Sequence, residues 1–170
     1  RTRTLGSALL HPGGLANYFR PLAREVYFAL MTPIAGTHPF AYHLVNLIGL
    51  LIAAALLLDL LAEMVPWPAA LTGVLWFLTL PLMRVDVLWI SCAQDVFALA
   101  FTLGAFALWR RRRDRLAMLV WLCAVLSKQS ALPLPAALFV WSVWREGERP
   151  AATMRRLVPF AFPVVVWALG

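Results

Sequence analysis

The sequence predicts an all-α membrane protein, a polytopic transmembrane helix bundle of about five to six spans preceded by an N-terminal extracytoplasmic amphipathic segment. Of its 170 residues, 62% are hydrophobic and only 14% are charged, which lies outside the usual balance of a soluble domain. Trp67, Trp89, Trp109 and Trp144 stand near the ends of apolar runs, where aromatic belts form at the two membrane interfaces. We therefore expect a multi-pass integral protein of the bacterial inner membrane or the endoplasmic reticulum.

Residues 1–36 are expected to form an extracytoplasmic loop domain. Pro12, Gly13 and Gly14 interrupt the chain, and residues 15–30 then alternate aromatic, apolar and charged side chains. This pattern predicts one or two short amphipathic helices on the membrane surface, followed by a turn at 33–36. Residues 37–170 form the predicted transmembrane domain. We expect this sequence to be truncated at both ends, because it begins with Arg1 and stops inside an apolar run.

The first span is expected over about residues 39–64, with Pro39 in the first helical turn, where its missing N–H is tolerated. Asp59 and Glu63 are interpreted as its solvated end. After a turn at 66–68, the remaining spans are expected at about 69–83, 87–109, 116–131, 132–144 and from 157 onward. Pro133 and Pro135 are predicted to break the connection between the fourth span and the short fifth span.

Most basic residues lie in two short loops, 110–115 and 145–156. Basic loops between apolar spans are typical of the cytoplasmic side, so the net charge of +7 does not indicate nucleic-acid binding. Alternation of the spans then brings the remaining polar residues to the extracytoplasmic face: Arg20, His38, His43, Asn46, Arg84, Asp86, Asp95 and Lys128. Cys92 and Cys123 fit small buried side chains better than a disulfide, and their spacing forms no metal motif.

The polar stretch 84–95 contains the two acidic residues that are hardest to explain as scaffold, Asp86 and Asp95. A carboxylate at such a depth costs about 2.5–3.5 kcal/mol on insertion scales, so it indicates a functional site. Asp95 lies roughly 9 Å below Trp89 at the helical rise, and Lys128 lies at a similar level, which predicts an Asp95–Lys128 ion pair or a shared polar cavity. Asp86 and Asp95 point to opposite sides of one ideal helix. They can share a site only if the helix starts after Asp86 or breaks near Ser91.

Four motifs occur in order along the chain: residues 18–22 (YFRPL), 36–46 (GTHPFAYHLVN), 89–95 (WISCAQD) and 126–131 (LSKQSA). Together they resemble the GT-C class of multi-spanning glycosyltransferases, and most closely the protein O-mannosyltransferase-related membrane domain of transmembrane and tetratricopeptide-repeat proteins. The resemblance implies transfer of a sugar from a polyprenyl-phosphate carrier to a protein or glycan acceptor at the extracytoplasmic face. The residues that match motif positions are Arg20, His43, Asn46, Asp95 and Lys128.

The sequence departs from the family pattern at three positions. Leu80 replaces the histidine of a His-Pro pair, Asp86 lies one position from the expected acid, and Gln129 stands where glutamate is common. The acid of the family's first loop would lie upstream of Arg1. Asp86 is then the best general base available.

The predicted site therefore has two parts. Asp86 and Asp95 are the predicted catalytic residues, and Arg20, His43, Asn46, Arg84 and Lys128 are the predicted substrate and lipid-phosphate contacts. No metal ligands are assigned, although the cofactor is left open and a divalent metal is compatible with this chemistry.

Two other classes of function are compatible with the sequence. In the first, the segment is a non-catalytic membrane anchor or scaffold of a tetratricopeptide-repeat protein, and Asp95 and Lys128 only hold helices together. In the second, it is a transporter or lipid-handling protein, for which charged residues at mid-membrane depth are also expected. The second ranks last, because the sequence has no evident inverted repeat.

Overall fold

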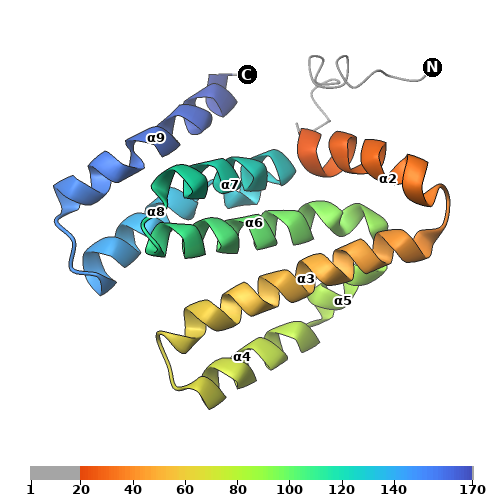
Figure 1. The fold of residues 1–170 in the computed structure, drawn as a ribbon, viewed down its shortest axis with the longest axis horizontal. Coiled ribbons are helices and arrows are strands. Elements are labelled where there is room, and N and C mark those ends of the chain that lie inside the picture. Colours follow the sequence, from red (N-terminus) through yellow and green to blue (C-terminus); the bar gives the residue numbers. More distant parts are fainter. Residues whose placement is uncertain (1–19, 170) are drawn as a thin grey trace.

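The computed structural model describes residues 20–169, with side chains up to residue 161. Every secondary-structure element in this range is helical (Figure 1), as predicted. Much of the predicted amphipathic segment, residues 1–19, lies outside the described residues. The elements in chain order are η1 (Pro21–Val26), α2 (Tyr27–Ala35), α3 (Pro39–Ala62), α4 (Trp67–Thr79), α5 (Pro81–Leu88), η2 (Ile90–Cys92), α6 (Ala93–Arg110), α7 (Asp114–Ser127), η3 (Gln129–Ala131), α8 (Leu134–Val140), η4 (Trp141–Arg145) and α9 (Pro150–Leu169).

Proline marks the start of several helices. Proline is tolerated in the first turn of a helix, because the N–H that it lacks has no intrahelical partner there. Pro39 begins α3, as predicted from the sequence, and Pro81 begins α5. Pro135 stands in the first turn of α8, and a 3-10 turn and Pro133 separate α8 from α7. The predicted break between the fourth and fifth hydrophobic segments is confirmed.

The turn predicted at 33–36 begins later than expected. α2 continues through Pro33 to Ala35, and the chain turns at Gly36, whose φ is +53°. A left-handed φ favours glycine, because a Cβ would clash with the backbone. The Tyr42 hydroxyl donates a 2.9 Å hydrogen bond to the Gly36 carbonyl. This contact joins the turn to the first part of α3.

The central layer of the bundle consists of α3, α6 and α7. α6 packs against α3 on one side and α7 on the other (Figure 1), while α4 lies along α3. The α3–α6 approach is close at Gly49, where a Cβ would lie 2.6 Å from Val96 Cγ1. The largest buried cluster lies between α6, α7, α8 and α9 and includes Trp109, Trp121 and Phe160.

Trp109 does not belong to the interfacial belt that its position predicted. Its side chain is fully buried, and its indole N–H donates a 2.9 Å hydrogen bond to Ser142 Oγ. An indole is tolerated in a core when its N–H finds an acceptor, which the sequence position alone could not reveal. Trp67, Trp89 and Trp144, in contrast, are exposed and fit an interfacial position.

The part of the chain that the structure describes does not confirm the predicted five or six spans. By length and composition two qualify among the described residues, Pro39–Ala62 and Ile90–Arg110, and α4 with α5 makes a third if this bent pair is one span. The pair bends by 58° at Leu80, where the following Pro81 disfavours helical backbone. α7 has 14 residues and α8 has 7, so neither reaches the roughly 20 residues of a straight span.

The basic loops lie together at one end of the bundle. Arg110 at the end of α6 forms ion pairs with Asp59 and Glu63 at the end of α3. Arg145 donates to the Glu63 backbone oxygen at 2.7 Å. The predicted meeting of these loops at one end is therefore confirmed. Asp59 and Glu63 remain half-exposed, as expected, and also link α3 to α6.

Candidate functional site

The opposite end of the bundle contains the predicted polar cluster, and a break in the helix brings its two acids together. α5 ends at Leu88, Trp89 is extended, and α6 begins only at Ala93. The Asp86 and Asp95 carboxylates and the Cys92 thiol have ligand atoms within 4.8 Å of one another. The break near Ser91 is the condition under which Asp86 and Asp95 were expected to share a site, and it is met.

Two side chains of α3 hold the end of α5. Asn46 is fully buried, and its Nδ2 donates to the backbone oxygens of Asp86 at 3.0 Å and Trp89 at 3.3 Å. His43 Nδ1 forms a 2.9 Å hydrogen bond with the Val87 oxygen, and since a carbonyl can only accept, Nδ1 carries the proton. The last carbonyls of a helix have no intrahelical partner. His43 and Asn46 supply these partners and fix where Asp86 lies.

The structure places Asn46, a predicted substrate or lipid-phosphate contact, in the interior of the protein. Its side chain has no exposed surface, and its amide hydrogens are directed at the α5 and Trp89 carbonyls. Asn46 is a positioning residue. His43 is half-buried and positions α5 through Val87.

The predicted ion pair between Asp95 and Lys128 is confirmed. α7 ends at Ser127, and Lys128 itself is extended, with φ −159° and ψ 136°. The Lys128 ammonium thereby reaches the Asp95 carboxylate in the first turn of α6. Their side chains are 28% and 29% exposed, so the pair borders the surface of the site and is open to a ligand.

Arg20 joins three elements at the same end. Its Nη1 donates to Gln94 Oε1 at 2.6 Å, and its Nε and Nη2 each lie 3.3 Å from Gln129 Oε1. Arg20 precedes η1, Gln94 lies beside Asp95 on α6, and Gln129 follows Lys128. The two residues that accept from the Arg20 guanidinium are therefore the sequence neighbours of Asp95 and Lys128, the two members of the ion pair. Gln94 was missed by sequence reasoning, although its position next to Asp95 was a signal.

Arg84 is not brought into the cluster. It is exposed on α5 and has no hydrogen bond or ion pair with any residue that the structure describes. Asp86 is two residues further along the same helix, on another face. His38 is also exposed, at the N-cap of α3. Phosphate binding by Arg84 stays a prediction.

Cys92, which the sequence indicated as a small buried side chain, lies beside the two acids. The thiol donates a hydrogen bond to Asp86, and it completes the only group of three potential metal ligands within residues 20–161. Two carboxylates and a thiolate suit zinc or a similar divalent ion, and three protein ligands would leave a fourth position open. Lys128 already neutralises Asp95. A metal would therefore compete with the ammonium for that carboxylate.

An aromatic cluster packs against the start of α6, next to the site. Tyr27 makes edge contacts with Phe28, Tyr42 and Phe97, and these rings pack against Ala93 at the start of α6. The Tyr27 hydroxyl is buried without a hydrogen-bond partner among the described residues. Burial, and secondarily Tyr42, raises the pKa of Tyr27 to about 12. The phenol therefore stays neutral throughout the physiological range.

Comparison with known proteins found no matching family model, curated protein or solved structure.

Proposed function

We propose that this chain is a glycosyltransferase of GT-C type that acts at the extracytoplasmic face and moves a sugar from a polyprenyl-phosphate carrier to a hydroxyl of a protein or glycan acceptor. The observation that carries the proposal is the convergence of Asp86, Asp95 and Lys128 at one end of a membrane bundle. Lys128 is 33 residues from Asp95 in the sequence, and the break between α5 and α6 brings Asp86 to Asp95. Intramembrane ionisable groups gathered in this way are typical of a functional site.

The residues suit the two needs of sugar transfer from a lipid phosphate. Asp86 takes the proton of the acceptor hydroxyl as its oxygen bonds to the anomeric carbon. The bond from that carbon to the phosphate oxygen breaks, and its electron pair leaves with the polyprenyl phosphate. Lys128 stabilises the departing phosphate. Arg20 lies near Lys128, because it donates to the side chain of the next residue, Gln129. General base catalysis contributes typically 10²–10⁴-fold, and cations at the leaving oxygen stabilise the transition state further.

Asp95 has a different role from Asp86. In the absence of a donor it holds the Lys128 ammonium, and a phosphate that arrives competes for the same cation. The Asp95 carboxylate therefore prevents an unpaired charge at membrane depth and orients Lys128.

The second candidate is a non-catalytic membrane anchor of a tetratricopeptide-repeat protein. It is favoured by the same ion pair, because Asp95–Lys128 links α6 to the α7–η3 connection and needs no substrate to do so. Leu80 in place of histidine and the exposed position of Arg84 also fit this candidate.

The two candidates are separated by transfer of labelled sugar in membranes that contain the full-length protein, tested with a panel of polyprenyl-phosphate sugars. The glycosyltransferase proposal expects transfer with at least one donor and its loss in Lys128→Ala. Transfer by none of the donors, with the protein folded and present, would favour the anchor. Equal transfer by wild type and Lys128→Ala would show that Lys128 has no role in sugar transfer.

A further inference from the structure

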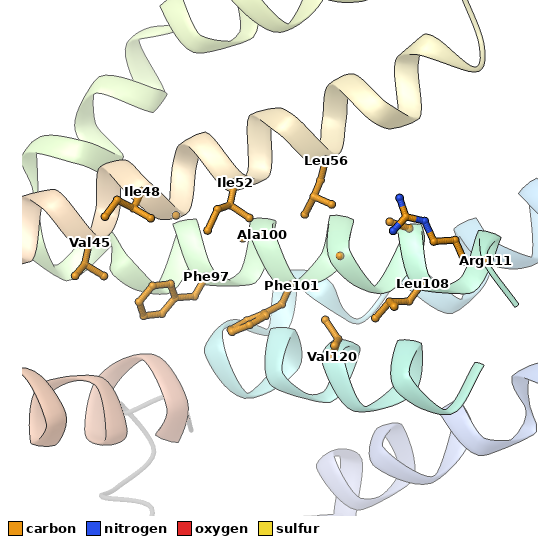
Figure 2. A pocket seen from close by; sticks show the side chains of 13 residues that line it. Val45, Ile48, Ile52, Leu56, Phe97, Ala100, Phe101, Leu108, Arg111 and Val120 are labelled. Carbon is orange, nitrogen blue, oxygen red and sulfur yellow. The ribbon is translucent and has the colours of Figure 1, made fainter. Parts of the chain in front are cut away.

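An apolar groove of about 520 Å³ runs between α3, α6 and α7 (Figure 2). Its walls include Ile48, Ile52 and Leu56 from α3 and Phe97, Phe101 and Leu108 from α6. Both helices are candidate membrane spans, so the groove lies at the depth of the hydrocarbon. Its volume falls within the range of roughly 300–1,000 Å³ that is usual for ligand sites.

Arg111 is the one charged residue among those that line the groove. Figure 2 shows its side chain at one end, beyond Leu56 and Leu108. The side chain is 66% exposed, and its Nη2 lies 3.9 Å from Asp59 Oδ2. That carboxylate is closer to Arg110, at 3.4 Å. Arg111 therefore keeps an accessible guanidinium where the groove meets the membrane interface.

We propose that this groove binds one anionic phospholipid from the leaflet on the side of the basic loops, with its phosphate at Arg111 and an acyl chain between α3 and α6. From Phe97 to Arg111 the groove follows α6 for about 21 Å at the helical rise. One leaflet of hydrocarbon is about 15 Å deep, so the groove accommodates the whole depth of a chain. Basic residues at the ends of spans attract anionic headgroups, and basic pockets between transmembrane helices bind them.

The floor of the groove is shaped by small residues. A Cβ at Gly104 would lie 3.6 Å from Val120 Cγ1 and 3.8 Å from Leu56 Cδ1, so alanine fits there and a longer side chain enters the groove. Ile52 lies on the rim and is 51% exposed, so tryptophan at this position can cover the groove without disturbing the core. The headgroup end of this lipid site, at Arg111, lies at the opposite end of α6 from Asp95, and lipid binding there does not depend on sugar transfer.

The test is binding of phosphatidylglycerol and phosphatidylcholine to the purified full-length protein, measured by native mass spectrometry of lipid titrations. Arg111→Gln is expected to weaken phosphatidylglycerol binding about fivefold, which corresponds to about 1 kcal/mol per basic residue near an anionic surface. It is expected to weaken phosphatidylcholine binding less, because the choline cation offsets the phosphate charge. Arg115→Gln, an exposed arginine in the first turn of α7 and outside the groove, is the matched control and should change neither.

Two variants that fill the groove complete the test. Gly104→Leu and Ile52→Trp are expected to reduce binding of both lipids, and Ile52→Trp keeps the test valid if Gly104→Leu does not fold. Equal effects of Arg111→Gln and Arg115→Gln would assign the lipid to a diffuse electrostatic shell and overturn the proposal. Unchanged lipid binding in Ile52→Trp would mean that another part of the protein or another molecule covers the groove, which would also overturn it.

Discussion

Asn46 Nδ2 lies 3.0 Å from the Asp86 backbone oxygen, and this hydrogen bond joins the N-terminal part of α3 to the residue proposed as general base. The bond is fully buried, and Asn46 donates in addition to the Trp89 oxygen at 3.3 Å. The end of α5 is thus held by a side chain that is three residues from His43, one turn away on the same face of α3. The position of Asp86 depends on α3 as much as on its own helix.

Replacement of Asn46 by alanine is expected to destabilise the protein by about 1–2 kcal/mol, because the buried Asp86 carbonyl and the partly buried Trp89 carbonyl lose their donor. The measurement is the free energy of unfolding of the purified protein, from thermal or denaturant unfolding. The control is Thr72→Val, since the exposed Thr72 hydroxyl bonds only within its own helix, to Pro68. Equal stability of Asn46→Ala and Thr72→Val would show that α5 is held by apolar packing alone.

The Asp95–Lys128 pair is expected to show measurable coupling in a double-mutant cycle. Asp95→Asn and Lys128→Gln should each destabilise the fold, and the double variant should lose about 1 kcal/mol less than the two together, because each single change leaves one charge without its partner. The exposed Arg111–Asp59 pair, at 3.9 Å, is the control and should couple by less than about 0.5 kcal/mol. Strictly additive effects of the Asp95 and Lys128 changes would contradict the ion pair.

Two tyrosines of the aromatic cluster should respond oppositely to loss of the hydroxyl. Tyr27→Phe is expected to stabilise the fold by up to about 1 kcal/mol, because the buried Tyr27 hydroxyl has no partner among the described residues. Tyr42→Phe is expected to destabilise it by about 1 kcal/mol, because it removes the hydrogen bond to Gly36. Unfolding midpoints of the two variants measure this difference. A destabilised Tyr27→Phe would mean that its hydroxyl has a partner outside residues 20–169.

Replacement of Arg156, even by lysine, is expected to destabilise the protein. Its guanidinium donates to both oxygens of Asp114 and of Glu148 and lies 3.8 Å from the centre of the Trp109 ring. A lysine ammonium cannot make these bidentate contacts, so Arg156→Lys should cost about 2–3 kcal/mol. The neighbouring Arg155 is exposed, and Arg155→Lys should change the free energy of unfolding by less than about 0.5 kcal/mol. Similar unfolding of the two variants would contradict this account.

The sequence was sufficient to predict the ion pair at the polar end of the bundle. Spacing and helical rise placed Asp95 and Lys128 at one depth, and the ion pair follows from that. The positive-inside pattern brought the basic loops to one end, although which side of the membrane that end faces stays a prediction. These inferences succeeded because helix geometry and the cost of buried charge are local rules.

The sequence did not predict features that depend on tertiary partners. Trp109 is buried because its indole N–H donates to Ser142 and Arg156 packs over its ring. Both partners are distant in the sequence, and the residues around Trp109 do not predict them. The sequence predicted a span at about 69–83, and the structure bends by 58° within it, at Leu80, just before Pro81. Cys92 was interpreted as a small hydrophobe, because its neighbours Asp86 and Asp95 come together only through the break before α6.

The central claim is that Asp86 removes the acceptor proton, and the rate of sugar transfer by Asp86→Asn tests it most directly. The comparison uses full-length protein at matched expression, with Asp59→Asn as the control for loss of a carboxylate at the other end of the bundle. We predict that Asp86→Asn lowers the rate by about 10²–10⁴-fold, while Asp59→Asn stays near the wild-type rate. A folded Asp86→Asn protein that transfers sugar as fast as Asp59→Asn would contradict the account.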